Sequence, residues 1–381
     1  MILAWLLAPA VLLALFTGIG LGVARIAGPG LPSALVPACG MAASFVTGAV
    51  LADLAHELIV PALVGLAMAG AIAGRDRIRW AGGAAFGVAL AAFSLYALPI
   101  VLSGEATFAG YVKLDDTATW LAITDRVMDA GVTTQGLPAS TYEAVLSINF
   151  ANGYPVGGFA PLGFVSRVLG EDPAWLFQPY LAVIAAVLAL ALWELARDAT
   201  ERVPVRAAIA VGASCSALLA GYYLWGGIKE LQTAALFAAV TAAALRTPIA
   251  APRAAAGAAV LACGLVAAGG AGALVWAAPT GALLAARAVR AGRRARRAVA
   301  LAGAGAIAIV TAIVATGAGL SPFRGSFTNQ EDLGNLAAPL EPAQILGIWP
   351  AFDFRFDPYS DWLAYGLMAL AASATPSAIV P

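Results

Sequence analysis

Apolar stretches of about 20 residues follow one another along most of the chain, and this is the length at which a helix crosses the hydrocarbon core of a bilayer. They lack the polar-apolar alternation of barrel strands, and only helices and closed barrels satisfy their backbone hydrogen bonds in lipid. Charged residues make up 11% of the chain, against about 25% in soluble domains. The sequence therefore predicts an all-α, polytopic integral membrane protein and excludes a water-soluble fold.

Apolar length and flanking charge place about eleven transmembrane helices. The predicted spans are 2–24, 34–52, 58–73, 80–102, 175–196, 206–225, 231–245, 254–268, 270–286, 298–318 and 361–378. The chain shows no fixed-period repeat, no low-complexity linker and no nucleotide-binding glycine loop. We therefore expect one transmembrane domain over residues 1–381.

The arginines indicate the orientation of these spans, because short cytoplasmic loops carry an excess of Lys and Arg. One set of alternate loops holds 15 of the 21 basic residues, and the opposite set holds 17 of the 21 acids. The arginine-rich set comprises Arg25, Arg75, Arg77, Arg79, Arg197, Arg202, Arg206, Arg246, Arg253 and the six arginines from Arg287 to Arg297. This predicts a cytoplasmic arginine-rich face and an amino terminus outside. We interpret the six-arginine run as an orientation signal beside anionic lipid, and expect no nucleic-acid partner.

Two long polar loops then face outside: the first large extracytoplasmic loop at 103–172 and a second at 319–360. In the first, LDDTATWLAITDRVMDAG predicts an interfacial helix in which Trp120, Ile123 and Val127 share a face and Gly131 follows the end. Farther on, NGYPVGGFAPLGFVSRVLGEDPAW is too short and too broken to span, which predicts a second surface-lying or re-entrant helix. Polar chemistry is therefore concentrated at the outer face.

Asp115 and Asp116 are the catalytic candidates in the first loop. A carboxylate that is partly desolvated and close to other acids has a raised pKa, which suits a general base acting on a hydroxyl. Asp is also a common helix cap, so either residue has a purely structural alternative. The local sequence leaves both interpretations open.

The succession of the acidic pair, Trp120 and a turn containing Tyr154, Pro155 and Gly157 before the next long span resembles the GT-C superfamily of membrane glycosyltransferases. The resemblance covers residues 100–200 best. It implies a GT-C-like fold and an enzyme of the cell envelope that uses a polyprenyl-phosphate-linked sugar. The implied location is the cell membrane, as a multi-pass protein in the cytoplasmic membrane of a bacterium.

The implied reaction is an inverting transfer of a sugar from a polyprenyl-phosphate donor to an acceptor hydroxyl on the extracytoplasmic face, with an Asp as base. Its partners are the lipid-linked sugar donor, a glycan or lipid acceptor and membrane lipids. The leaving phosphate needs fixed cations near the membrane surface. Lys113 and Lys229 are the only lysines of the chain, and both fall on the predicted outer face. Lys229, beside Glu230 at a Gly-Gly break, is the first candidate to bind the phosphate, although a lysine at a helix end also commonly extends to lipid headgroups instead. Glu230 and Tyr154, which lies in the family-like turn, are further candidates for substrate binding.

The second loop adds aromatic residues, acids and two arginines, which suit sugar recognition. Arg324 and Arg355 are candidates to bind phosphate in a bidentate manner, or to pair with acids of their own loop. A divalent cation is a further option through oxygen ligands from Glu331, Asp332, Asp353 and Asp357. Their spacing matches no metal motif, so we assign neither a metal ligand nor a cofactor.

Two alternatives stay open. A transporter or flippase for a lipid-linked or small substrate would place charged or broken-helix sites near mid-membrane and often shows inverted repeats. The predicted spans keep nearly all charges at their ends, which favours chemistry at the surface. A noncatalytic assembly protein of an envelope pathway would not need the loop with the acidic pair.

Overall fold

The computed structural model describes residues 3–77, 81–108, 116–247, 253, 255–270, 272–315 and 366. Within these residues the chain is helical throughout and contains no strand. The first half holds η1 (Leu3–Leu7), α1 (Ala8–Ala27), η2 (Ser33–Leu35), α2 (Val36–Leu54), η3 (His56–Leu58), α3 (Ile59–Ala73), η4 (Arg75–Arg77), α4 (Gly83–Val101), α5 (Asp116–Ala130), α6 (Thr141–Ala151), η5 (Gly157–Phe159) and α7 (Ala160–Leu169). The second half holds α8 (Pro173–Leu195), η6 (Ala196–Asp198), α9 (Val203–Ser214), α10 (Ala217–Leu224), α11 (Ile228–Arg246), α12 (Ala255–Gly269), α13 (Ala273–Ala291) and α14 (Arg293–Ala315).

Six helices of the described residues are long and apolar enough to cross a membrane, and each coincides with a predicted span. They are Leu3–Ala27, Ser33–Leu54, His56–Ala73, Gly83–Val101, Pro173–Asp198 and Ile228–Arg246. A seventh span is possible where α9 and α10 meet at a 49° bend, within the predicted span 206–225. The prediction of an all-helical fold with several long apolar helices is therefore confirmed, and these helices fit a multi-pass membrane protein.

The remaining predicted spans differ in status. At 254–268 the structure has α12, an apolar helix of 15 residues, which is shorter than the ~20 residues of a typical span. Near 270–286 and 298–318 it has α13 and α14, which are not among the six. The predicted span 361–378 lies outside the described residues, apart from the single helical residue Gly366.

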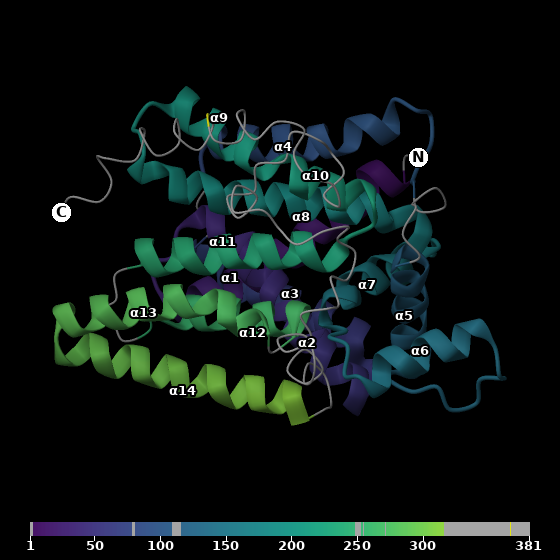
Figure 1. The fold of residues 1–381 in the computed structure, drawn as a ribbon. Helices are drawn as coiled ribbons and strands as arrows, with labels where there is room; N and C mark the ends of the chain where they lie inside the picture. Colours follow the sequence, from purple (N-terminus) through teal and green to yellow (C-terminus); the bar gives the residue numbers. More distant parts are fainter. Residues whose placement is uncertain are drawn as a thin grey trace.

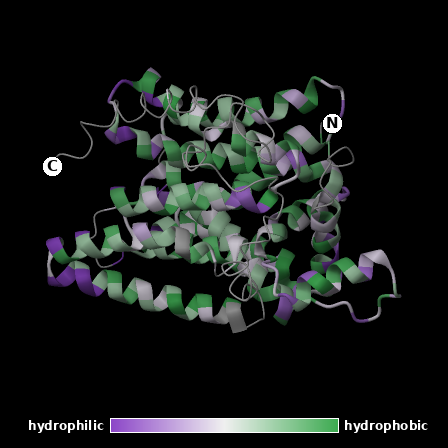
Figure 2. Ribbon diagram, in the orientation of Figure 1, coloured by the Kyte–Doolittle hydropathy of each residue, from purple (hydrophilic) through white to green (hydrophobic). Residues whose placement is uncertain are grey.

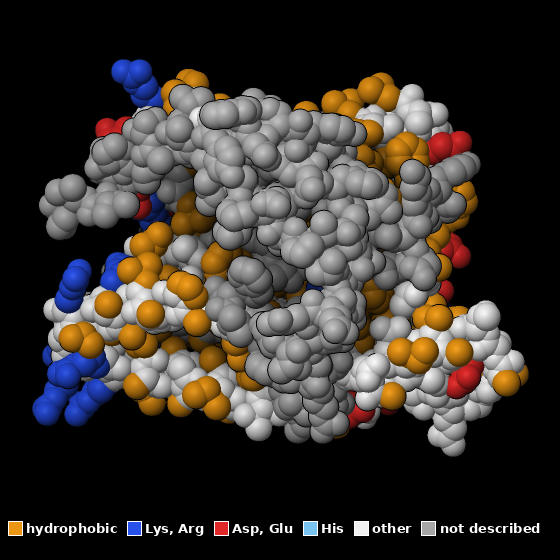
Figure 3. Space-filling model, viewed as in Figure 1, with side chains coloured by type: hydrophobic (Ala, Val, Ile, Leu, Met, Phe, Trp, Pro, Cys, Tyr) orange, Lys and Arg blue, Asp and Glu red, His pale blue; other side chains and the backbone are white. Residues whose placement is uncertain are grey.

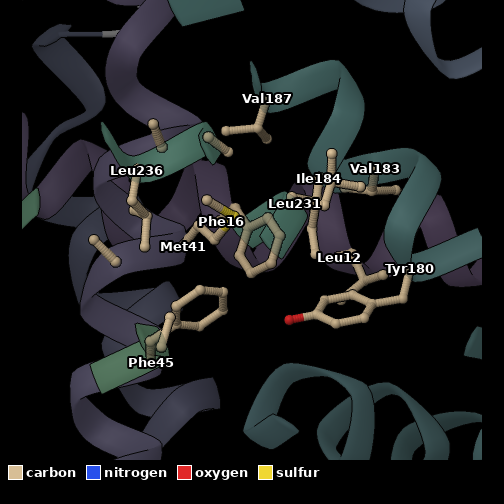
Figure 4. Packing of buried hydrophobic residues seen from close by; sticks show 14 of the residues in the cluster. Leu12, Phe16, Met41, Phe45, Tyr180, Val183, Ile184, Val187, Leu231 and Leu236 are labelled. Atoms are coloured by element: carbon tan, nitrogen blue, oxygen red, sulfur yellow. The ribbon is translucent and has the colours of Figure 1, made fainter. Parts of the chain in front are cut away.

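The bundle is organised around α8, whose apolar stretch is 83% buried, whereas that of α3 is 17% buried. Helices α1, α4, α9 and α11 pack against α8, while α3 lies on the outside of α1. Figure 4 shows the core where these helices meet, with Phe16, Phe45, Tyr180 and Leu231 contributed by α1, α2, α8 and α11. Since α3 contacts the bundle along one side, its other faces are free to contact lipid.

Glycines allow α1 and α3 to approach closely. A Cβ placed on Gly18 would lie 2.8 Å from the backbone oxygen of Ala67, and one on Gly22 would lie 3.1 Å from the Cα of Gly70. Small residues at such crossings are typical of membrane helices, where close van der Waals packing replaces the hydrophobic drive of water. The α1–α3 pair is therefore fixed by backbone contact.

The ends of the helices divide the charges between two poles. In Figure 1 the long helices run side by side, with α5, α6 and α7 at one end and the α13–α14 turn at the other. Figure 2 shows the bundle helices as mostly hydrophobic, with hydrophilic residues towards their ends. In Figure 3 most visible Lys and Arg side chains gather at the pole of the α13–α14 turn, and most visible Asp and Glu at the pole of α5 and α6.

We call the first pole the arginine end, which comprises Arg25, 75–77, 194–206, 244–247, 253 and 287–297. The second pole is the acidic end, which comprises 53–57, 103–108, 116–172 and 226–232. Ion pairs between distant segments join the arginine end: Arg25 pairs with Asp76 at 2.9 Å, and Arg246 with Asp198 at 2.7 Å. At the acidic end, the Val132 N–H donates to the Ala52 carbonyl at 3.1 Å. The described parts of the loop sets that were predicted to face opposite sides thus lie at opposite ends of the bundle.

Candidate functional site

Three aromatic rings from separate segments meet at the acidic end. Trp120 of α5 stacks on Tyr154, with ring centroids 4.8 Å apart and planes 23° from parallel. Phe159 of η5 completes the group, at 5.7 Å from Trp120 and 6.3 Å from Tyr154. We call these three residues the aromatic cluster. Stacked aromatic faces of this kind suit contact with the C–H face of a sugar or with a cation.

Lys229 brings a positive charge to the aromatic cluster. Its Nζ lies 4.9 Å from the ring centroid of Tyr154, within the range of a cation–π interaction. It is the second residue of α11, so the helix start at Ile228 holds it at the acidic end. None of the ion pairs between described residues includes Lys229. The structure therefore brings together two predicted site residues that are 75 positions apart, Tyr154 and Lys229.

The acidic pair is described in part. Asp116 is the first residue of α5, and Trp120 follows four residues later, so their backbones are about one helical turn, or roughly 6 Å, apart along the axis. Of the other predicted site residues, Asp115, Lys113, Arg324 and Arg355 lie outside the described residues. Asp116 thus begins the helix that contributes Trp120 to the aromatic cluster, one turn before that residue.

Glu230 follows Lys229 on α11 and is half-buried. A Cβ on Gly227 would lie 3.0 Å from its Oε2, so the carboxylate folds back over the Gly-Gly break that precedes α11. The break brings the two opposite charges of Lys229 and Glu230 to the start of one helix.

The turn that carries Tyr154 enters deeply between the helices. Gly153 has a φ of +66°, and residues from Pro155 through Ser166 are buried. A Cβ on Gly157 would overlap the carbonyl oxygen of Phe45 and lie 2.8 Å from that of Ala267, so the glycine lets η5 insert between α2 and α12. Of the surface-lying and re-entrant options for this segment, its burial among the helices fits the re-entrant one.

The segment before α5 is tethered where it leaves α4. The Trp5 indole N–H donates to the Ala106 carbonyl at 2.8 Å, and Gln178 Oε1 accepts from the Phe108 N–H at 3.0 Å and from the Thr107 hydroxyl. Gln178 is on α8 and fully buried. The chain is thus fixed on η1 and α8 up to Phe108, before it continues to the acidic pair.

The helix predicted after the acidic pair is present as α5, and its apolar stripe faces protein. Trp120, Ile123 and Val127 are at most 8% exposed, and α5 packs against α7, α8, η3 and η5. Gly131 ends the helix with a φ of +75°. In Figure 1, α5 crosses the direction of the long helices at their end, as a helix in a membrane interface would.

A second group of charges lies on another face of α5. Arg167 of α7 forms an ion pair with Asp129. Burial raises the pKa of Asp125, the nearby Asp172 and Asp129 raise it further, and Arg167 lowers it. In the described residues no group of three or more His, Cys, Asp or Glu residues has the geometry of a metal site. The carboxylates proposed above for a divalent cation, at 331–357, fall outside the description.

Sequence reasoning did not find Phe159, the helix α6 or the buried residues Tyr180 and Gln232 behind the turn. For α6 a signal was present: Ser140 and Glu143 form the S-x-x-E pattern of a capping box, and the Ser140 hydroxyl oxygen accepts the Glu143 N–H at 3.2 Å. For Tyr180 and Gln232 there was none, because each lies in an apolar helix and acquires its partner from a distant segment.

Comparison with models of protein families, with curated proteins and with solved structures found no match to this chain.

Proposed function

We propose that the protein is a GT-C-like membrane glycosyltransferase that transfers a sugar from a polyprenyl-phosphate donor to an acceptor hydroxyl. One observation carries the proposal: the Lys229 ammonium, which has no acidic partner in the described ion pairs, lies over an aromatic cluster that begins one turn after Asp116. A fixed cation, a stacking surface and a carboxylate at one end of a helical bundle are what such a transfer requires.

In the proposed reaction Asp115 or Asp116 accepts the proton of the acceptor hydroxyl. The acceptor oxygen forms a bond to the anomeric carbon, the bond from that carbon to the phosphate oxygen breaks, and polyprenyl phosphate leaves with the electron pair. The configuration at the anomeric carbon inverts. Lys229 stabilises the negative charge that develops on the leaving phosphate. Tyr154, which is half-buried, contacts the sugar, and the buried Trp120 supports the Tyr154 ring from behind. Lys113, Arg324 and Arg355 are proposed as further phosphate contacts.

We further propose that the arginine end faces the cytoplasm and the acidic end faces outside, in the cytoplasmic membrane of a bacterium. The excess of arginine at one pole supports this orientation. The proposed eleven spans are the six long apolar helices and five further segments: the bent pair α9–α10, helices α12, α13 and α14, and residues 361–378. The lipid-linked donor would reach the acidic end laterally from the bilayer.

The bend between α9 and α10 favours the second candidate, a transporter or flippase, because broken helices often mark transport sites. At this bend, however, the Ser214 carbonyl accepts from the Tyr96 hydroxyl of α4 at 2.7 Å, and the Tyr223 hydroxyl of α10 donates to the Tyr96 carbonyl at 2.7 Å. In each of the six candidate spans, charged residues lie within three residues of the start or five of the end. A charged mid-membrane site is thus missing from these six helices.

The test incubates the purified full-length protein in nanodiscs with a panel of polyprenyl-phosphate sugars and acceptors, and compares wild type with Asp115→Asn and Asp116→Asn. A general base contributes about 10²- to 10⁴-fold, so we expect at least one variant to lose transfer by a factor in that range. Glu105→Gln, an exposed acid of the same loop, serves as the control. Undiminished transfer in both Asp variants would eliminate the base, and lipid scrambling in vesicles without any transfer would support the flippase.

A further inference from the structure

Behind the aromatic cluster, three polar groups meet in an otherwise apolar core. The Gly158 carbonyl accepts from the Tyr180 hydroxyl at 2.7 Å and from the Gln232 Nε2 at 2.8 Å, and the same Nε2 lies 3.0 Å from the Tyr180 oxygen. Tyr180 and Gln232 are at most 1% exposed. In Figure 4 the Tyr180 hydroxyl points inward from α8 among apolar side chains. Such a network is costly to break, because a buried polar group left unpaired has no water to replace its partner.

This network connects the same two segments as the contact between Lys229 and Tyr154. Gln232 is one turn after Lys229 on α11, so the two side chains point to the same side of that helix. Gly158 is four residues after Tyr154 and directly precedes Phe159. A Cβ on Gly158 would overlap the Gln232 amide. Helix α11 and the turn at 154–159 are therefore joined at two points, one buried and polar, the other the cation–π contact.

We infer that Gln232 is a positioning residue for Lys229. Its hydrogen bond to the Gly158 carbonyl, which also accepts from Tyr180, fixes the position of α11 along its axis relative to the turn at 154–159. This holds the Lys229 ammonium over the Tyr154 ring. Without the bond, α11 and the turn are free to shift relative to each other, and a charge–aromatic contact weakens with small displacements. The consequence for phosphate binding rests on the proposed function, whereas the effect on the position of Lys229 does not.

Because the chain has only two lysines, Lys113 and Lys229, the surroundings of the Lys229 ammonium can be measured directly by NMR. Reductive ¹³C-dimethylation keeps the positive charge and labels Lys229, Lys113 and the amino terminus, and the ring current of Tyr154 displaces the Lys229 NMR signal. In Gln232→Leu we expect this signal to move towards the free-lysine position, while the Lys113 signal stays in place. Tyr180→Phe, which removes only the hydroxyl, is expected to produce a smaller shift in the same direction and covers the case in which Gln232→Leu fails to fold.

The control is Thr241→Val, which removes the partly buried hydrogen bond between Thr241 of α11 and Thr280 of α13 at 3.0 Å. Thr241 lies about 18 Å along the helix from Lys229 at 1.5 Å per residue. It should leave the Lys229 signal unchanged. An unchanged Lys229 signal in folded Gln232→Leu and Tyr180→Phe overturns the inference, as does an equal shift in Thr241→Val.

Binding of undecaprenyl phosphate to the same proteins separates the two proposals. We expect Gln232→Leu to lower the affinity about tenfold. In a Lys229→Met background the same substitution should lower it little further, because the losses of binding free energy do not add when one residue acts through the other. Full additivity contradicts the inference. A displaced Lys229 signal in a protein whose wild type binds no polyprenyl phosphate supports the positioning role while the proposed function fails.

Discussion

Helix α11 carries one cation at each end, and the two cations have different surroundings. At the arginine end Arg246 donates to the Glu194 carbonyl at 3.0 and 2.8 Å and to the Asp198 carboxylate at 2.7 Å. At the acidic end Lys229 lies over an aromatic ring, without an acidic partner among the described ion pairs. Arg246 therefore holds helix ends together, whereas Lys229 has no such acidic partner among the described residues, and the proposed function assigns it to the donor phosphate.

Other arginines at the same end repeat this structural role. Arg206 donates to the Trp193 carbonyl at 2.7 Å and lies 3.6 Å from the centroid of the Trp193 ring, and Arg287 donates to the Ala244 carbonyl. These carbonyls lie in the last turns of α8 and α11, where a helix has unpaired acceptors and a partial negative charge. Arginines at this end thus stabilise helix termini, in addition to the orientation that we propose for this end.

The largest expected contrast comes from removing each cation of α11. Lys229→Met should lower the affinity for undecaprenyl phosphate about 10- to 100-fold with little loss of stability, because a charge-assisted hydrogen bond contributes about 1.5–3 kcal/mol. Arg246→Met should do the reverse and lower the free energy of unfolding by about 1–3 kcal/mol, since it leaves the partly buried Glu194 carbonyl without its donor. Isothermal binding and thermal unfolding in nanodiscs measure the two quantities. If both variants lose the same property, the two ends do not differ as described.

A second comparison concerns two glycines of the bundle. Gly158→Ala places a methyl group into the Gln232 amide, whereas Gly65→Ala on α3 adds one where no atom lies within 4 Å. Overpacking costs about 1–3 kcal/mol, so Gly158→Ala should lower the unfolding temperature. Gly65→Ala should be neutral or stabilising, because Ala is the better helix former. Equal unfolding temperatures for the two variants would show that the turn is loosely held.

The smallest expected effect is a pH dependence at the acidic end. The folded protein raises the pKa of Asp125 through burial and the neighbouring Asp172 and Asp129, so the folded state holds this proton more tightly than the unfolded chain. The charged carboxylate thus lowers stability at neutral pH, and the penalty is lost as the pH falls through the raised pKa. Asp125→Asn should raise the unfolding temperature at pH 7, with the gain vanishing below about pH 4. A lower unfolding temperature at pH 7 would contradict this direction.

Much of the fold could be predicted from the sequence because apolar length is a local property. The six long helices match predicted spans, and the stripe of Trp120, Ile123 and Val127 identified α5 and its buried face. The alternation of arginine-rich and acidic loops indicated which helix ends share a pole. The exact number of spans was less predictable, because short, bent or arginine-flanked helices satisfy the length rule only in part.

The site was predictable as a set of residue types, but its geometry was not. Tyr154 and Lys229 were predicted as site residues for separate reasons. Only the packing of the turn at 154–159 against α11 places the Lys229 Nζ 4.9 Å from the Tyr154 ring centroid. The hydrogen bonds of Gln232 and Tyr180 to the Gly158 carbonyl could not be predicted from the sequence, because every residue has a backbone carbonyl and no residue type marks the one that accepts. Glycines at 157 and 158 were the only local sign that this turn is tightly enclosed.

The most direct test of ligand binding at the acidic end is to map the attachment sites of a photoreactive polyprenyl phosphate on the full-length protein by mass spectrometry. We expect adducts within 116–130, 154–159 or 228–232 that undecaprenyl phosphate displaces, phosphatidylglycerol does not, and Lys229→Met loses. Adducts concentrated on α13 and α14, displaced equally by both lipids, would show that the arginine end is the phosphate-binding end and would contradict the proposed site.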